Sequence, residues 1–478
     1  MFTIDPRRFD PSCVTTVIAT IAVALTACAG PGSLPPAAQR IAPQALGLDG
    51  GTIAPELADR WWSAFGDADL DALVAKALQD HPSLRVAAAP LQRVRALAER
   101  LDAQRLPQVD ARMDLLHQRF PEHGLFPPSV AGQVKDTGSL QTTFAWELDF
   151  FGRNRAAFEA GLSAERAAQA DEQAARLLLA STVVRTYVQL AQLVAQRAIA
   201  ERALAQRSQV LALIRRRVQV GLDTNVELRQ GEAALPEIRQ TLEALDEQIV
   251  LHRHALAALA VQAAENLEQL RPTIESLRDV ALPTELPADL LGRRPDVDAA
   301  RWRIEAATSD LRAARAEFYP SVNLLGFAGF NAIGLGNVLD SGSRYTGVGP
   351  ALRLPLFDAG RLRANYRGKA ADLDASIALY NAAVIEAVRE VSDRIATVRS
   401  VARQQIEQSL ANDAAEGAYD LAEARYAKGV ASYLTVLSAE SAVLAQRRVA
   451  VDLKARTLVA KADLMRALGG GYVAGPEQ

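Results

Sequence analysis

The sequence predicts a mainly α-helical fold with a membrane β-barrel part, built as a tandem repeat of long helices with four β-strands. Three observations lead to this class. The chain is duplicated, each half contains two short stretches of alternating polarity, and each half contains a stretch of about 65 residues without proline, long enough for about 100 Å of helix. Matching residues recur 213 or 208 positions later: Pro82 with Pro295, Pro107 with Pro320, Gly152 with Gly360, and Gly221 with Gly429.

The N-terminus indicates the compartment. Arg7 and Arg8 precede an apolar run at 14–25, which is too short to span a bilayer and is typical of a signal peptide. Cys28 follows Leu-Thr-Ala, a sequence that resembles a bacterial lipoprotein box, in which the cysteine becomes the acylated first residue. We therefore predict a signal peptide over 1–27, lipid attachment at Cys28 and a lipidated leader over 28–66. The alternative for Cys28 is a buried thiol.

The composition excludes several classes of function. The net charge of −3 over 478 residues argues against nucleic acid as a partner. Of the five histidines, His252 and His254 lie two positions apart, which on a helix directs them to nearly opposite sides and does not suit one metal ion. No nucleophile motif or phosphate-binding glycine loop is recognisable. We therefore expect no enzyme activity, no metal and no cofactor.

Each half reads as helices, two strands, a long helix, a turn and a further helix. Proline interrupts the first helical region at Pro82, because it lacks a backbone donor and disfavours helix in the preceding residue. The predicted elements of repeat 1, residues 67–281, are strands at about 108–118 and 139–150 and helices at 154–219 and 224–265. Those of repeat 2, residues 282–470, are a helix at 295–318, strands at about 320–331 and 345–356, and helices at 361–427 and 433–468, followed by a tail at 471–478.

The predicted strands alternate in polarity, clearly in the first repeat and more weakly in the second. Val109, Ala111 and Met113 are separated by charged residues, so one face of the sheet is apolar and the other polar. Strands of about ten residues cross a membrane when tilted, but a barrel needs about eight of them. Four strands leave unpaired edges in lipid, so several copies must share one barrel. The alternative is a soluble four-stranded sheet packed on helices; the signal sequence and the aromatic residues near the strand ends favour the membrane.

Glycine marks two kinds of junction. Gly152 and Gly360 are predicted at strand-to-helix corners, where a residue without a side chain accepts unusual backbone angles. Two further glycines interrupt the long helical pairs, within Val220-Gly221-Leu222 and Lys428-Gly429-Val430. The corner glycines are explained by architecture and are assigned no chemistry, whereas the tip motifs are explained equally well by a simple helix-helix turn.

Seven motifs in order resemble the outer-membrane factor family, the TolC and OprM type of efflux channel, in its lipoprotein branch. They are Trp62 with Phe65-Gly66-Asp67, then 146–153, 290–297 and 355–361, then Arg425-Tyr426 with Gly429, Tyr433-Leu434, and finally 467–471.

The resemblance implies a homotrimer whose twelve strands form one barrel in the outer membrane of a Gram-negative bacterium, continued by an α-helical tunnel in the periplasm. Such a protein is the exit duct of a tripartite efflux pump. Its expected partners are outer-membrane lipid, a periplasmic adaptor protein and an inner-membrane pump, often of the resistance-nodulation-division class. The alternatives are the duct of type I protein secretion and a lipid-anchored coiled-coil protein that spans the periplasm without conducting.

The resemblance also implies site residues. The adaptor is expected to dock at the tips, Val220, Gly221, Leu222, Lys428, Gly429 and Val430. The periplasmic gate is expected at Leu434, Thr435 and Ser438, where the last two replace the acidic residues common in the family. Glu227 is expected opposite Tyr426, as an acceptor of its hydroxyl hydrogen bond that holds the gate closed. An ordinary solvated glutamate is the alternative for Glu227.

Overall fold

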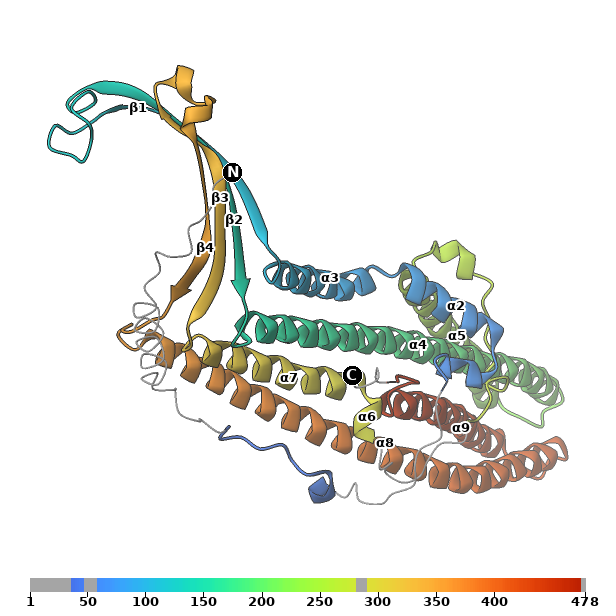
Figure 1. The fold of residues 1–478 in the computed structure, drawn as a ribbon. Coiled ribbons are helices and arrows are strands. Elements are labelled where there is room, and N and C mark those ends of the chain that lie inside the picture. Colours follow the sequence, from blue (N-terminus) through green and yellow to red (C-terminus); the bar gives the residue numbers. More distant parts are fainter. Residues whose placement is uncertain (1–35, 47–57, 281–289, 474–478) are drawn as a thin grey trace. The chain divides into compact units, whose positions relative to one another are not determined.

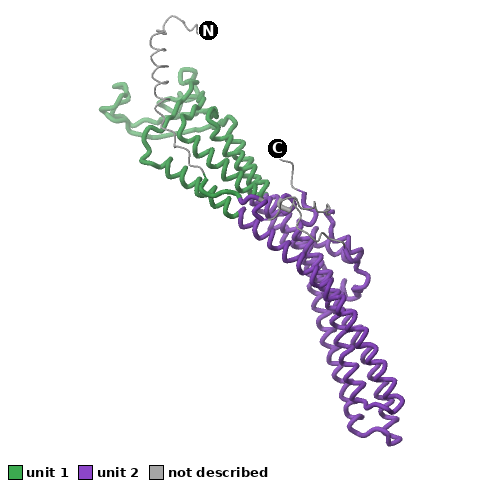
Figure 2. The backbone as a smooth tube through the Cα atoms, turned by 90° about the horizontal axis from the view of Figure 1, so that it is seen from below, with its two compact units in different colours: residues 1–40, 92–167, 301–379 green, residues 41–91, 168–300, 380–478 purple. Residues whose placement is uncertain are grey.

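The computed structural model describes residues 36–46, 58–280 and 290–473. The predicted signal peptide, Cys28 and residues 474–478 lie outside this described part. The described residues form two compact units (Figure 2): one comes from residues 36–40, 92–167 and 301–379, and the other from 41–46, 58–91, 168–280, 290–300 and 380–473. Each unit therefore takes segments from both repeats, so the compact units cut across the sequence duplication.

The four strands form one antiparallel sheet in the order β1-β2-β3-β4 (Figure 1). Their bounds are β1 Gln108–Arg119, β2 Val134–Leu148, β3 Ser321–Ile333 and β4 Arg344–Arg353. The central pairing of β2 with β3 joins the hairpin of one repeat to the hairpin of the other. Among the described residues β1 and β4 each pair on one side only, so the sheet has two open edges.

The register puts most apolar residues of β1, β2 and β4 on one face, as the alternation predicts, whereas β3 places apolar residues on both faces, with Leu325 and Phe327 on the more polar one. Directly paired residues share a face, and one row across the sheet runs Val109, Phe144, Gly326 and Val348. The other face carries polar groups, and there the Tyr345 hydroxyl donates to Gln141 Oε1 at 2.8 Å. This pattern suits a barrel wall with lipid on one side and water on the other.

Two helices precede the sheet, and their boundary is set by proline. The carboxylate of Asp67 accepts hydrogen bonds from the backbone N–H groups of Asp69 and Leu70, both at 3.0 Å, and so caps α2, Ala68–Asp80. The chain leaves helical geometry at His81, directly before Pro82, and α3 continues over Pro82–Ala103. The corresponding helix of the second repeat, α7, spans Pro295–Ala316.

The long helices come in two matched pairs. Helices α4, Arg153–Gln219, and α8, Arg361–Ala427, have 67 residues each, whereas α5, Asn225–Leu259, and α9, Tyr433–Ala467, have 35 each. The helix predicted to reach residue 265 stops at Leu259. The short elements are η2 Pro43–Leu46, η3 Trp61–Phe65, η4 Ala264–Leu267, α6 Leu290–Arg293, η5 Leu335–Asn337 and η6 Ser341–Ser343.

The largest hydrophobic core lies where α4, α5 and α9 pack together with α2. Its fully buried side chains include Tyr187, Leu190, Leu256 and Leu458. Alanine occupies many of the remaining buried positions, for example Ala180 and Ala462. Small side chains let helices approach closely, which explains how such alanine-rich helices form a packed wall.

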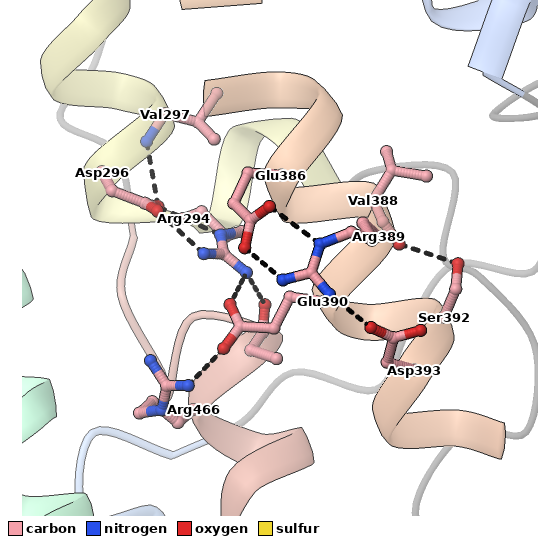
Figure 3. A network of polar contacts seen from close by, with 11 residues as sticks. Arg294, Asp296, Val297, Glu386, Val388, Arg389, Glu390, Ser392, Asp393 and Arg466 are labelled. Carbon is pink, nitrogen blue, oxygen red and sulfur yellow. Dashed lines mark hydrogen bonds and ion pairs between the residues drawn. The ribbon is translucent and has the colours of Figure 1, made fainter. Parts of the chain in front are cut away.

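A buried arginine organises the start of α7 (Figure 3). Arg294 donates to Asp296 at 2.7 and 3.0 Å, to Glu390 of α8 at 2.9 Å and to the backbone oxygen of Ala467 at 3.0 Å. Glu390 also pairs with Arg466 of α9. Burial would raise the pKa of Asp296, but the Arg294 guanidinium outweighs it and lowers that pKa. One arginine therefore joins three helices and satisfies a carbonyl at the end of α9.

Candidate functional site: the helical tips

Two turns with the same geometry connect the long helices. The first tip, residues 220–224, joins α4 to α5, and the second tip, residues 428–432, joins α8 to α9. In the first, Leu222 N–H donates to Arg217 O at 2.8 Å and Gly221 N–H donates to Val218 O at 3.1 Å. The second repeats both bonds, from Val430 to Arg425 at 3.0 Å and from Gly429 to Tyr426 at 2.9 Å. This is the Schellman ending of a helix.

The tip glycines have the left-handed conformation that this ending requires. The φ angle is 76° at Gly221 and 77° at Gly429. A Cβ atom on Gly221 would meet no atom within 4 Å, so backbone conformation and not lack of space calls for glycine there. The predicted tip residues Val220, Leu222, Lys428 and Val430 are all exposed, as a docking surface would need.

A cluster of three residues ties the two hairpins together, and we call it the tip latch: Arg217, Asp223 and Tyr426. Arg217 makes a bidentate ion pair with Asp223, at 2.9 Å from Nε and 3.1 Å from Nη2. The Tyr426 hydroxyl donates to Asp223 Oδ2 at 2.6 Å, and the Arg217 guanidinium lies 4.6 Å from the centre of the Tyr426 ring. Arg217 and Asp223 belong to the first hairpin and Tyr426 to the second.

The latch is held in one protonation state by its surroundings. Burial raises the pKa of Asp223, but hydrogen bonds from Arg217 and Tyr426 outweigh it and lower that pKa below its ordinary value. Burial, followed by the hydrogen bond to Asp223, raises the pKa of Tyr426. The carboxylate therefore stays charged and the phenol stays protonated at neutral pH, which preserves the charge-assisted hydrogen bond.

The predicted pairing of Tyr426 with Glu227 is wrong. Glu227 instead accepts a hydrogen bond from Thr224 N–H at 2.9 Å, and Thr224 Oγ1 accepts one from Val226 N–H at 3.1 Å. This capping arrangement satisfies free N–H groups at the start of α5 and occupies the Glu227 carboxylate. Asp223 takes the predicted role because the Schellman turn brings it back over Arg217.

The latch could have been found by comparing the repeats. Arg217 has a counterpart in Arg425, but Asp223 corresponds to Ala431 and Tyr426 corresponds to Val218. The second repeat therefore lacks the carboxylate, and the first repeat lacks the phenol. Only one of the two symmetric positions can form the latch, and this difference between otherwise matched tips was the available sequence signal.

The predicted gate residues lie on the first turns of α9, next to the latch. Leu434 is 61% exposed, and Thr435 and Ser438 are exposed as well. Their neighbour Tyr433 is buried and lies 6.0 Å from Tyr426 between ring centres. Exposed apolar and hydroxyl groups thus occupy one face of α9, while the other face packs in the cluster around Tyr426, Ile214 and Val436.

A second ion pair, which is buried, lies further along the hairpins. Arg207 of α4 and Glu440 of α9 are both 8% exposed, and Nε donates to Glu440 Oε2 at 3.1 Å. Arg207 also donates to the Ala234 carbonyl of α5 at 3.0 Å. Burial raises the pKa of Glu440, while Arg207 opposes this rise. The pair therefore fixes the registers of three helices.

The strand-to-helix corners have positive φ angles, 75° at Gly152 and 88° at Gly360. Aspartates start the helices that follow: Asp149 Oδ2 accepts from Arg155 N–H and Asp358 Oδ2 accepts from Leu362 N–H, both at 2.7 Å. Across the described ranges, no group of three or more histidine, cysteine, aspartate or glutamate side chains is arranged to hold a metal ion.

A sheet with open edges and paired helical hairpins defines one segment of a channel wall shared by several copies. The family model described as outer membrane efflux protein matches residues 73–261 and 286–470. The chain therefore belongs to the outer membrane efflux protein family and is an outer-membrane efflux channel. Channels of this family are trimers that work with adaptor proteins and inner-membrane pumps.

Relatives and solved structures agree with this assignment. The chain is 31% identical over 421 residues to the multidrug resistance outer membrane protein MdtQ of Escherichia coli O157:H7, covering 86% of this chain and 88% of MdtQ. It is 34% identical over 370 residues to the fusaric acid resistance protein FusA of Burkholderia cepacia, covering 73% and 68%. The crystal structure of the outer membrane protein VceC of Vibrio cholerae matches with a TM-score of 0.80 and 32% identity, covering 87% of this chain and 99% of that one.

Proposed function

We propose that three copies of this chain form the exit duct of a tripartite pump for drugs and other small organic solutes, and that the tip latch holds the duct closed at its periplasmic end. A periplasmic adaptor docks on the exposed tips, and an inner-membrane pump, of the resistance-nodulation-division class, supplies the energy. Acylation at Cys28 anchors each copy to the outer membrane.

The observation that carries the closing mechanism is the bond from Tyr426 to Asp223. It joins the second hairpin to a carboxylate that Arg217 already holds on the first hairpin. Because both hairpins end in exposed apolar residues beside this bond, an adaptor that binds the tips acts directly on the two elements that the latch connects. If the adaptor binds more tightly to the separated hairpins than to the joined ones, its binding therefore shifts the duct toward the open state.

The names of relatives favour small solutes over polypeptides. MdtQ is named for multidrug resistance and FusA for fusaric acid resistance, and neither name refers to protein secretion. Type I secretion is therefore the weaker candidate. The coiled-coil alternative does not fit a chain that is an outer-membrane efflux channel.

The latch is tested by single-channel recordings of purified protein in planar bilayers. Tyr426→Phe removes one hydrogen bond to a charged acceptor and keeps the ring, so we expect about a tenfold higher probability of the open state, the factor that corresponds to about 1.4 kcal/mol. The matched control is Tyr419→Phe, because Tyr419 is buried in the same hydrophobic cluster and makes no hydrogen bond through its hydroxyl in the described part of the chain.

Glu227→Ala separates the latch from the helix cap. It removes the capping carboxylate but leaves Asp223 in place, so the open probability should stay at the wild-type level. An unchanged open probability in Tyr426→Phe, or an increase in Glu227→Ala alone, contradicts the latch. Drug susceptibility of cells that carry each variant then tests whether opening and export are linked.

A further inference from the structure

A cavity of about 290 Å³ lies at the corners where the sheet meets the helices. It is bordered by the ends of β2 and β4 and the starts of α4 and α8, which Figure 1 shows at one end of the sheet. Glu147 of β2 and Arg353 of β4 line it, and the strand register puts both on the polar face of the sheet. In a closed barrel this face is the water-filled interior.

The basic groups of the cavity are not all neutralised. Arg153 pairs with Glu147 at 2.6 Å. Arg353 and Arg361 also line the cavity, and neither forms a hydrogen bond or ion pair through its side chain with any residue that the structure describes. Two guanidinium groups are therefore available to an external anion.

The carboxylates of the cavity are already engaged. Asp149 caps α4 by accepting from Arg155 N–H, and Glu317 accepts from Asn365 Nδ2 at 3.3 and 3.4 Å. The start of α8 is capped in the same way by Asp358. The helix dipoles at this corner are thus satisfied from within the chain. Asp149 and Glu317 keep their negative charge, and Asp358 interacts electrostatically with Arg361, so the attraction for an anionic ligand comes from two guanidinium groups with free donors and not from a net positive charge.

A flat aromatic surface adjoins the arginines. The rings of Phe151 and Tyr319 stack with 4.9 Å between their centres and 10° between their planes, and both line the cavity. Phe151 remains 43% exposed, so its ring can contact a further flat group. A guanidinium beside an aromatic face matches a planar carboxylate attached to a ring.

We propose that this corner cavity is a binding site for small aromatic carboxylates on the inner wall of the duct. Arg353 and Arg361 bind the carboxylate, and Phe151 with Tyr319 contacts the ring. This proposal depends on the proposed duct in one respect: the cavity has to open into the interior of a closed barrel. It gives the duct a preference among solutes in addition to any choice made by the pump.

The test is fluorine NMR of the purified, detergent-solubilised protein with 4-fluorobenzoate as the probe. We expect saturable line broadening with wild type, and at least tenfold weaker binding in Arg353→Gln/Arg361→Gln, because the variant removes two charge-assisted donors and the loss of one already corresponds to about this factor. The matched control, Arg363→Gln/Arg367→Gln, removes the same charge from the same end of α8 at exposed arginines that do not line the cavity, and should bind as wild type does.

Two further probes make the test independent of variant folding. Trifluoroacetate lacks the ring and 4-fluorobenzylamine reverses the charge, so both should bind wild type at least tenfold more weakly than 4-fluorobenzoate. The proposal is overturned if 4-fluorobenzoate does not bind wild type, or if 4-fluorobenzylamine binds equally well. It is also overturned if 4-fluorobenzoate binds equally well to the Arg353/Arg361 variant, which is the result expected if these arginines instead contact a neighbouring copy. Conductance is measured on the same samples, so a failed site and a failed duct are distinguishable.

Discussion

Asp223 illustrates how the role of one residue depends on the turn that carries it. In sequence it stands two positions after a glycine and looks like an ordinary polar turn residue. In the structure it is the shared acceptor of Arg217 and Tyr426. Its depressed pKa follows from these two donors, which outweigh the opposing effect of burial.

The pH dependence of the latch follows from this depressed pKa. Both Arg217 and Tyr426 lower the pKa of Asp223 in the closed state, and only Arg217, which is on the same hairpin, still lowers it after opening. The Tyr426 bond therefore stabilises the closed state at pH values above the pKa of the open state, and this stabilisation is lost as the pH falls through the lower pKa of the closed state. We therefore expect a constant closed population from pH 5 to 8 and opening only below about pH 4. Single-channel recordings across this range measure it.

Asp223→Asn provides the comparison. The neutral amide cannot pair with Arg217 as an ion, so the variant should be more open at pH 7 and show no further opening on acidification. If this variant keeps the acid-induced opening of wild type, a different group is responsible for it.

At the scale of elements, the tips differ from the rest of the helical hairpins in which substitutions they tolerate. Gly221 has open space around its missing side chain but a φ angle of 76°. Size and conformation can therefore be varied separately at this position, which is rarely the case for a buried glycine.

Gly221→Asn and Gly221→Val test this separation. Asparagine accepts the left-handed conformation, whereas a β-branched residue does not, so Val should cost roughly 1–2 kcal/mol and Asn clearly less. If the adaptor docks at this turn, Gly221→Val should also abolish efflux while trimers persist. Thermal unfolding and drug susceptibility measure the two effects, and full resistance in the valine variant would count against docking here.

The buried pair of Arg207 and Glu440 makes a second prediction about the hairpins. Glu440→Ala leaves the Arg207 guanidinium buried with its bonds to Ala234 O and Glu237, so we expect a loss of about 3 kcal/mol in stability, the lower end for breaking a buried pair. Replacing both partners, as Arg207→Met/Glu440→Leu, should recover most of this loss. Denaturant unfolding measures it, and equal destabilisation by the single and double variants would show that the charge pair itself is needed.

At the scale of the whole molecule, the open sheet edges require other copies. Edge strands β1 and β4 expose unpaired backbone groups that lipid cannot satisfy. We expect native mass spectrometry of the detergent-extracted protein to show three copies per particle, with each copy carrying acyl chains. A stable monomer with a folded sheet would contradict this expectation, and Cys28→Ser should remove the acyl mass without dissociating the trimer.

The sequence predicted the kind and order of the main elements well because each has a local cause. Proline stops α2 before Pro82, alternation produces the strands, and the absence of prolines leaves α8 uninterrupted from Arg361 to Ala427. The acceptor of the Tyr426 hydroxyl was predicted wrongly, since Asp223 and Glu227 are both acidic residues near the same turn and only the path of the backbone separates them.

By itself, then, the sequence determined the duplicated plan, the alternation of the first hairpin and the positions of the tip glycines, because periodicity and backbone preference act over a few neighbouring residues. Only the tertiary structure decided that Asp223 receives Tyr426, that Arg294 joins three helices, and that Arg353 and Arg361 share a cavity. These contacts bring together residues distant in the chain, and their partners are fixed by helix register and turn geometry that no local pattern encodes.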